Sequence, residues 1–578
     1  MKRFKRFTAL SVSLSMLTPY YAAAAQYKTE TPIEHLIVIV GENHTFDNIY
    51  GAYQPKNGET VSNLLAKGII NKNGKPGPNF YLGRQRHAVD RARDGYSISP
   101  QKKSAYATLP PPQTTYATGL LPGIADDRYP SHLPNGPFQL TNANAPVTSY
   151  FGDPPHRFFQ MWQQYDKGKN DLFVWVGLTA GIGSDNNFPG APIPGNTFQG
   201  SEAMGFFNIH TGDAPVFKAL ADHYAISDNF HQPVMGGTGA NFLALMTGDA
   251  GFYTEQGKAA IPPVSQIEDP NALPGWNNYY THDGYTGGSY VNCSDRNEPG
   301  VESIRSYLDT MKPFRHGNCT PNTYYLVNNY GLAYDPAGNL KPFDPSAQPP
   351  ATILPPQTIP TIADALSAKG ISWKYYSGGR NPDNTTTEEY CGICDPLTGF
   401  SSIMTTDLKN NLQGMDAFDS DVLSEQTLPA VAFIRPFESK AGHPANATLP
   451  DFEDFIMDVV NKVKANPKLW QKTAIMVTMD EGGGYYDSGY IQAIDFFGDG
   501  TRIPLVLVSP WAKKGHINHS YSDHASILKF IEKNWHIHPL SYRSRDNLPN
   551  PVHGPVNHQY VPKNMPAISD LMDMFDFY

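Results

Sequence analysis

The chain has 578 residues and a formal net charge of −10 at neutral pH, with 33 tyrosines, 30 phenylalanines, 50 glycines and 51 prolines. A chain of this length is too long for one small core and fits either several small domains or one large domain with insertions. The negative charge argues against a nucleic-acid-binding protein, and the many aromatic residues argue against a disordered one.

The first 25 residues have the composition of a cleavable signal peptide. Residues 1–6 are rich in Lys and Arg, residues 8–17 are apolar, and residues 22–25 are all alanine. Pro19 interrupts the apolar run, whereas a membrane anchor needs about 18 unbroken apolar residues. We therefore expect cleavage after Ala25, passage through the export machinery, and a secreted or periplasmic mature protein that begins at Gln26.

Four cysteines fit the oxidising environment of an exported protein. The most local pairing joins Cys293 to Cys319 and Cys391 to Cys394. The two-residue spacing between Cys391 and Cys394 is also found in redox and zinc sites. Because this segment is polar, loop-like and without a second such motif, a structural disulfide is the preferred interpretation.

The regular structure begins with an apolar, largely β-branched run at residues 33–40, which predicts a strand buried on both faces. The run ends at Gly41 and is followed by Glu42 and Asn43. Ligands in open α/β sheets bind beyond the carboxyl ends of such strands. Glu42 and Asn43 are therefore candidates for binding a metal or a phosphate.

Two long segments rich in Pro, Gly and Asn interrupt the regular pattern. Residues 51–150 are too many for an ordinary connection and predict an irregular segment that covers the site. Residues 253–360 contain two of the cysteines and predict a cap-like insertion. We expect residues 26–578 to form one domain that carries both segments.

Elsewhere, apolar runs alternate with segments of helical periodicity, a pattern that predicts an α/β fold with a mostly parallel central sheet flanked by helices. The expected strands are residues 173–176, 224–228, 371–376, 430–434, 473–479 and 503–508. One helix is expected to begin near residue 158, and the others are expected at residues 215–224, 242–247, 361–369, 452–463 and 525–532.

The strand expected at residues 473–479 ends as the first one does, in two side chains with oxygen atoms, Asp480 and Glu481. If the two strands are parallel neighbours, Glu42, Asn43, Asp480 and Glu481 meet at one edge of the sheet. Three carboxylates held together would repel one another unless a cation lay between them. Each pair alone would be read as solvated turn residues, but the two together predict a metal site.

Thr238 follows two glycines and precedes an apolar helix. A hydroxyl at a helix N-terminus lies among free backbone N–H groups that bind anions, and a nearby metal would help to deprotonate it to a nucleophile. The alternative is that Thr238 is only the N-cap of the helix. Among the 18 histidines, His156, His443 and His524 are candidates for acid, base or ligand roles, although each taken alone is more commonly structural.

Together, these motifs resemble those of the bacterial phosphoesterase family, which includes phosphatidylcholine-type phospholipases C and acid phosphatase A. The resemblance extends from about residue 33 to about residue 540 and is similar in detail to the zinc-dependent phospholipase C subgroup of Legionella and Pseudomonas. The matching segments, in the order of the family, are residues 42–47, 237–241, 480–483 and 509–512, followed by Asp523 and His524.

The resemblance implies an alkaline-phosphatase-like α/β fold. It also implies that Thr238 is the nucleophile, and that His156 and His443 contact phosphate or protonate the leaving group. Of the two, we expect His443 by preference to protonate the leaving oxygen. The metal ligands that the resemblance implies are Glu42, Asn43, Asp480 and Glu481. Many phospholipases of the family have Asp-Pro-Asn after the nucleophile, and acid phosphatase A has Ser as the nucleophile. Here Gly239, Ala240 and Asn241 follow a Thr, which favours the zinc-dependent subgroup.

The function expected from this resemblance is that of a secreted, metal-dependent phospholipase C. It would hydrolyse phosphatidylcholine-type lipids to diacylglycerol and phosphocholine while in peripheral contact with a membrane surface. One alternative is a phosphomonoesterase of the acid phosphatase type with the same site, and another is a non-catalytic secreted binding protein. The oxygen ligands suit calcium, magnesium or manganese, whereas the subgroup resemblance implies zinc, which is the preferred prediction.

Overall fold

The computed structural model describes residues 28–56, 58–88, 96–113, 124–179, 199–270, 288–314, 316–341, 353–554 and 559–578. The expected signal peptide lies outside the described residues. None of the helices in the described part of the chain combines the length and the apolar character needed to cross a membrane.

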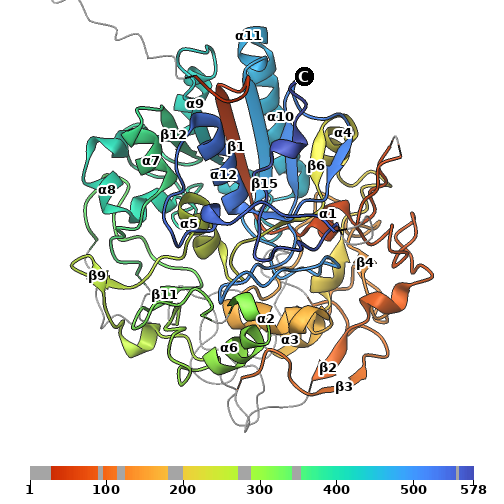
Figure 1. Ribbon diagram of the computed structural model, residues 1–578. Coiled ribbons are helices and arrows are strands. Elements are labelled where there is room, and N and C mark those ends of the chain that lie inside the picture. The colour runs from red at the N-terminus through yellow and green to blue at the C-terminus, as the bar shows by residue number, and fades with distance from the viewer. Residues whose placement is uncertain are drawn as a thin grey trace, which may run out of the picture.

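The centre of the molecule is an eight-stranded sheet with the strand order β13-β12-β14-β1-β15-β16-β6-β17 (Figure 1). Seven of the strands run in one direction and β16 runs against both of its neighbours. The prediction of an α/β fold with a mostly parallel sheet is therefore confirmed. The strands are β1 (His35–Gly41), β6 (Ala225–Ser227), β12 (Trp373–Ser377), β13 (Leu412–Gly414), β14 (Val431–Arg435), β15 (Thr473–Met479), β16 (Leu505–Val508) and β17 (His516–Asn518).

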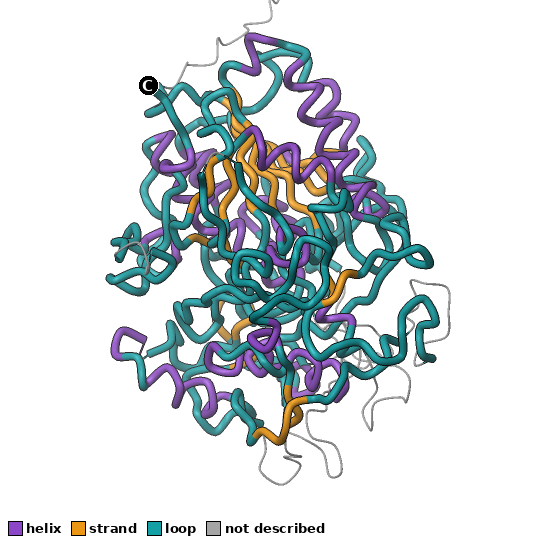
Figure 2. Tube along the Cα trace, turned by 90° about the vertical axis from the view of Figure 1, so that its right-hand side faces the viewer, coloured by secondary structure: helices purple, strands orange, loops and turns teal. Residues whose placement is uncertain are grey.

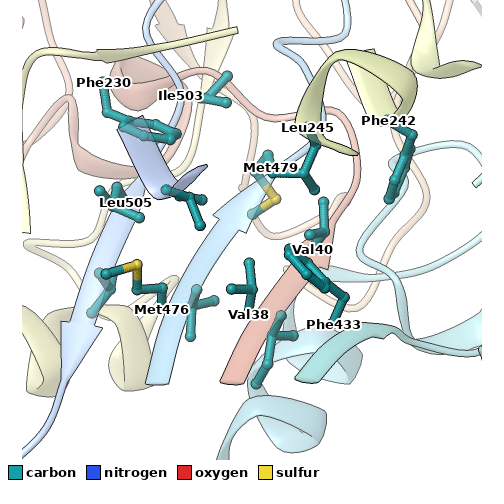
Figure 3. Close-up of a cluster of buried hydrophobic side chains, with 14 of the residues drawn as sticks. Val38, Val40, Phe230, Phe242, Leu245, Phe433, Met476, Met479, Ile503 and Leu505 are labelled. Atoms are coloured by element: carbon teal, nitrogen blue, oxygen red, sulfur yellow. The ribbon is translucent and has the colours of Figure 1, made fainter. Parts of the chain in front are cut away.

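Strand β1 lies between β14 and β15 and is buried along its whole length. Side chains alternate between the two faces of a strand. Val38 and Val40 point to the face covered by Phe242 and Leu245, as Figure 3 shows. Gly41 belongs to the opposite face, where an added Cβ would meet the ring of Phe452 at 2.5 Å. Helices therefore cover β1 from both sides.

The helix at Gly41 is α10 (Leu449–Lys464), which packs against β15 and against α4 (Pro215–His223). Its apolar residues recur every three or four positions, as expected from the sequence, and Thr448 caps its first turn by accepting a hydrogen bond from the backbone N–H of Asp451. The helix on the opposite face is α5 (Thr238–Thr247), which contacts α7 (Ile362–Ala368) and α12 (His524–Trp535).

Beyond the carboxyl edge of the sheet, the chain is mostly irregular, with short helices and two-stranded ribbons (Figures 1 and 2). The remaining helices are α1 (Phe46–Tyr50), α2 (Phe158–Tyr165), α3 (Phe173–Thr179), α6 (Val301–Asp309), α8 (Ser401–Met404), α9 (Met415–Asp421) and α11 (Pro467–Trp470). The small strands are β2 (Arg86–Ala88), β3 (Lys102–Ala105), β4 (Phe138–Gln139), β5 (Gly205–Phe206), β7 (Phe230–His231), β8 (Thr254–Glu255), β9 (Lys258–Ala259), β10 (Tyr290–Val291), β11 (Tyr325–Leu326) and β18 (Ser522–Asp523).

One expected strand is wrong, because residues 173–176 form the first turn of helix α3. Gln85 accepts a hydrogen bond from the backbone N–H of Phe173, and the residues of this turn are buried. A short apolar run that is buried all round has the same composition in a helix and in a strand. Both expected disulfides, Cys293–Cys319 and Cys391–Cys394, are present.

Candidate functional site

Strands β1 and β15 end side by side, because their parallel register pairs Gly41 with Met479. The residues that follow therefore meet, as the sequence predicted. The backbone N–H of Asp480 donates to the carbonyl of Gly41 at 2.9 Å, and Asp480 Oδ1 accepts from the backbone N–H of Glu481 at 2.7 Å. The backbone N–H of Asn43 also approaches Asp480 Oδ1, at 3.4 Å.

The group formed by Asn43, Asp480 and Glu481 holds unused acceptors. In the part of the chain that the structure describes, Asn43 Oδ1, Asp480 Oδ2 and Glu481 Oε1 are buried and accept no hydrogen bond. Buried oxygens are normally satisfied, and leaving one unpaired costs about 1–3 kcal/mol. Amide and carboxylate oxygens left free in this way are the donor set of a divalent cation.

The pKa values of Asp480 and Glu481 also indicate that this group lacks a compensating positive charge. Burial, reinforced by the nearby carboxylates of Glu481 and Glu42, raises the pKa of Asp480 well above its usual range. Burial also raises the pKa of Glu481 to about 7, although the neighbouring His156 acts in the opposite direction. A bound cation would allow these carboxyl groups to ionise together.

Glu42 differs from the other three expected ligands because it already has a positive partner. Its Oε1 lies 2.8 Å from Nη2 of Arg435, the last residue of β14. Burial alone would raise the pKa of Glu42, but Arg435, helped by His443, lowers it. Arg435 also contacts Glu438 at 2.9 Å, and it is a residue that the sequence analysis missed.

Thr238 is the first residue of α5, and its side chain is buried next to Asp480, whose pKa it helps to lower. The N-cap of the helix is Gly237, which has no side chain to cap it, so the alternative role of Thr238 as an N-cap is wrong. The preceding turn is held by Asn241, whose Nδ2 donates to the carbonyls of Gly236 and Gly237. The hydroxyl of Thr238 is thus placed at a helix N-terminus, facing the carboxylates.

Helix α5 holds this position because its apolar side chains rest on the ends of the central strands. Leu245 lies next to Met479 and Val40, and Phe242 packs beside them (Figure 3). The backbone N–H of Gly239 also donates to Asn329 Oδ1 at 2.9 Å. The expected nucleophile and the expected ligands therefore sit on elements that are packed directly against each other.

His443 reaches the site from the loop after β14. Its Nε2 lies 2.9 Å from Nδ2 of Asn43, which leaves Asn43 Oδ1 free to bind a cation. The carbonyl of Gly442, one residue earlier, contacts His44 Nε2 at 2.8 Å. The backbone N–H of Glu42 donates to Ala441 O at 2.9 Å. The loop that carries His443 is therefore tied to the end of β1 at both of these points.

His156 reaches the site from the segment just before α2. Its Nδ1 contacts the carbonyl of Pro154 at 2.7 Å, and its Nε2 lies 3.6 Å from Glu481 Oε1. Asp153 Oδ1 lies 3.6 Å from the same ring and 4.0 Å from His443 Nε2. The sequence analysis did not assign a role to Asp153. Its place three residues before a candidate histidine is the signal that could have found it.

Other candidates have structural surroundings. His524 is buried behind the sheet edge, where its Nε2 contacts Met479 O at 2.9 Å and burial lowers its pKa to about 4. Tyr485 and Tyr486 follow Glu481 closely enough to suggest a cage for a choline group. Both rings are buried, however, and the Tyr485 hydroxyl donates to Gly152 O at 2.6 Å, so they pack the core instead.

Sequence comparison finds relatives among phosphoester hydrolases. Hemolytic phospholipase C from Pseudomonas aeruginosa is 23% identical over 419 residues, which are 65% of this chain and 43% of the relative. Phospholipase C B from Mycobacterium tuberculosis is 21% identical over 429 residues, 68% of this chain and 62% of the relative. A probable acid phosphatase from Kluyveromyces lactis is 27% identical over 202 residues, 33% of this chain and 45% of the relative. The chain spans less than two thirds of the length of each of these relatives.

Comparison with solved structures finds a protein in the alkaline phosphatase superfamily from Vibrio parahaemolyticus, with 11% identity and a TM-score of 0.26, covering 55% of this chain and 60% of that one. The family model named Phosphoesterase family matches residues 33–538. This match covers most of the chain and includes every predicted site residue, which confirms the expected family. The chain therefore belongs to the Phosphoesterase family.

Proposed function

We propose that the protein is a metal-dependent phospholipase C that cleaves phosphatidylcholine-type lipids into diacylglycerol and phosphocholine. The observation that carries the proposal is the set of three buried, unbonded oxygens on Asn43, Asp480 and Glu481, placed opposite Thr238. A protein that only bound a ligand would not need a hydroxyl and unpaired carboxylates at the same point. The similarity to phospholipases C from Pseudomonas aeruginosa and Mycobacterium tuberculosis supports the choice of substrate.

The cation would be held by Asn43, Asp480 and Glu481, with Glu42 completing the set. When bound, it would polarise a phosphoryl oxygen and favour the deprotonated form of the Thr238 hydroxyl. We propose zinc as the cation, on the basis of the resemblance to the zinc-dependent subgroup. Manganese, calcium and magnesium are the alternatives that a reconstitution experiment would compare, because the donors are oxygens.

The nucleophile in this proposal is Thr238. Its oxygen attacks phosphorus, the bond from phosphorus to the glycerol oxygen breaks, and the phosphocholine group becomes esterified to Thr238. Water then attacks the phosphothreonine, which releases phosphocholine and restores the hydroxyl. The N-terminus of α5 supports both steps, because its backbone N–H groups and dipole stabilise negative charge on the phosphoryl oxygens.

The two histidines would carry the protons. His156 lies between the carboxylates of Asp153 and Glu481, a setting suited to a proton donor, so we assign to it the protonation of the departing glycerol oxygen. His443 Nε2 lies 2.9 Å from Asn43 Nδ2, which places this ring nitrogen beside the group formed by Asn43, Asp480 and Glu481. We assign to His443 the removal of a proton from the attacking water. These roles exchange the preference expected from the sequence, in which His443 was the acid.

The test compares the wild type with Thr238→Ala and the matched control Thr238→Ser, on a phosphorylcholine diester and on a simple phosphate monoester. We expect Thr238→Ala to lower the diester rate by at least about 10³-fold, because it removes the nucleophile, and Thr238→Ser to keep measurable turnover. A chelator should abolish activity and added zinc should restore it.

Each outcome of this comparison selects one function. Diester hydrolysis that survives Thr238→Ala would exclude the proposed mechanism. A clear preference for the monoester would favour an acid phosphatase, the activity named for the Kluyveromyces lactis relative. An absence of metal-dependent turnover of both substrates would favour a binding protein. Export by the signal peptide and contact with a lipid surface belong to the same proposal.

A further inference from the structure

The disulfide between Cys391 and Cys394 lies directly against an expected metal ligand. Cys394 Sγ is 2.9 Å from Glu42 Oε1, and Cys391 Sγ is 3.9 Å from the same oxygen. Cys394 is fully buried, whereas Cys391 is partly exposed. Cys391 therefore borders the solvent from which an external thiol would come, and Cys394 lies against the carboxylate of a proposed metal ligand.

The chemistry of these three residues changes when the disulfide opens. In the disulfide, the sulfurs are bonded to each other and carry no charge that would attract a cation. Thiol–disulfide exchange with an external dithiol transfers two electrons and two hydrogens to Cys391 and Cys394 and leaves the dithiol as a cyclic disulfide. Two cysteines separated by two residues then have the spacing with which proteins bind zinc.

We propose that the reduced Cys391 and Cys394 form, together with Glu42, a thiophilic cation site beside the oxygen-lined site. Both sulfurs and a carboxylate oxygen of Glu42 lie within 4.8 Å of one another, close enough to share one ion. Binding of Zn²⁺ or Co²⁺ displaces two thiol protons and forms two metal–thiolate bonds. The site shares Glu42 with the proposed hydrolytic site, but its cation binding can be measured without turnover of a substrate.

The charges around the site are compatible with a divalent cation. Arg435 lies 2.8 Å from Glu42 Oε1 and is itself paired with Glu438 at 2.9 Å. Two thiolates and two carboxylates therefore outnumber the single guanidinium, and a divalent ion reduces this excess of negative charge. Since Glu42 belongs to both sites, the redox state of Cys391 and Cys394 would decide which site receives its carboxylate.

The test titrates Co²⁺ into the full-length protein before and after reduction by a dithiol, which is removed without air before the titration. Bonds from sulfur to cobalt give an intense near-ultraviolet charge-transfer absorption that oxygen ligands do not give. We expect the reduced protein to bind one more cobalt ion per chain than the oxidised protein and to show this absorption. A reduced protein that binds no extra cobalt, or binds it without the absorption, would overturn the proposal.

Two variants assign the signal to its residues. Cys391→Ser with Cys394→Ser should lose both the extra ion and the absorption, whereas the matched pair Cys293→Ser with Cys319→Ser should keep both on reduction. Absorption that persists without Cys391 and Cys394 would refute the site. If one of the two variants fails to fold, the other still assigns the signal, by losing it or by keeping it. Thr238→Ala should keep the absorption, so a failure of the proposed lipid hydrolysis would not be confused with a failure of this site.

Discussion

His156 and His443 both reach the group formed by Asn43, Asp480 and Glu481, and the atoms nearest to their rings differ. His156 has carboxylate oxygens of Asp153 and Glu481 near its two ring nitrogens, and His443 faces the amide of Asn43. Carboxylates thus lie near both ring nitrogens of His156, whereas the nearest group to His443 Nε2 is the Asn43 amide at 2.9 Å, with Asp153 at 4.0 Å. This contrast is the physical basis for assigning them different steps.

The assignment predicts different responses to the leaving group. His156→Ala should lower hydrolysis of a substrate with an alkyl leaving group by roughly 10²–10⁴-fold, and should leave hydrolysis of the matching p-nitrophenyl ester nearly unchanged, because p-nitrophenolate departs without a proton. His443→Ala should slow the release of phosphocholine from the enzyme for both substrates. Steady-state and single-turnover rates on the two esters measure these effects. Equal losses on both esters for His156→Ala would contradict its role as the acid.

Some residues of the candidate site could be predicted from the sequence, and others could not. Glu42, Asn43, Asp480 and Glu481 were predictable because each pair follows a recognisable buried strand. Arg435 also ends a buried strand, but a cation at that place gives no sign of its partner, which lies 393 residues away in the chain. The contact of Cys394 with Glu42 was not predictable either, since it depends on how a polar loop folds over the sheet edge.

At the scale of elements, the crowding around the end of β1 fixes the direction in which the chain leaves the sheet. A Cβ at Gly41 would lie 2.5 Å from the ring of Phe452 in α10 and 2.9 Å from the carbonyl oxygen of Ala441. The same carbonyl accepts the hydrogen bond from the backbone N–H of Glu42. The absence of a side chain at position 41 is therefore linked to the placement of Glu42.

Gly41→Ala should destabilise the fold by roughly 1–3 kcal/mol, because the methyl group overpacks the contact with α10. It should also weaken metal binding, since relief of the clash moves Ala441 and with it Glu42. Urea unfolding and metal content after dialysis measure the two effects. Gly399→Ala is the control, because its Cβ meets only a leucine side chain, at 3.2 Å. A Gly41→Ala protein as stable and as metal-replete as this control would contradict the argument.

Most elements of the central sheet were predictable because their periodicity and burial agree. Helix α10 and strands β1, β14 and β15 lie within a few residues of their expected bounds. Helix α3 was not predictable, because Phe173–Thr179 begins with aromatic and β-branched residues that favour a strand. Its helical state depends on packing partners far away in the chain, such as Gln85. The local preference of these residues for a strand therefore gave a wrong prediction, because tertiary packing stabilises the helix.

At the scale of the whole molecule, the buried carboxyl groups connect metal binding to global stability. The pKa of Glu481 in the metal-free folded protein is about 7, above its ordinary value of 4.5. Protonated Glu481 therefore stabilises the fold fully below about pH 4.5, and this contribution is lost as the pH rises through about 7. The shift corresponds to about 3 kcal/mol, because each pKa unit is worth about 1.4 kcal/mol.

We therefore expect chelated wild type to lose about 3 kcal/mol more unfolding free energy between pH 4.5 and pH 8 than chelated Glu481→Gln does. The glutamine keeps the size of the side chain but does not titrate. Saturating cation should restore the stability of the wild type at pH 8, since it binds the ionised carboxylates of the folded state alone. Parallel pH profiles for the two chelated proteins would contradict the prediction.

The pairing of β1 has a consequence for the order in which the molecule comes into being. β1 is the first of the described strands to be synthesised, yet its two neighbours in the sheet, β14 and β15, follow it by nearly 400 residues or more. Asn43 and Asp480 are 437 positions apart. The residues that follow β1 are therefore synthesised long before those that follow β15. A partly made chain consequently has no cradle for a cation. Any hydrolytic activity therefore begins only after Asp480 and Glu481 have been synthesised and have folded against the end of β1.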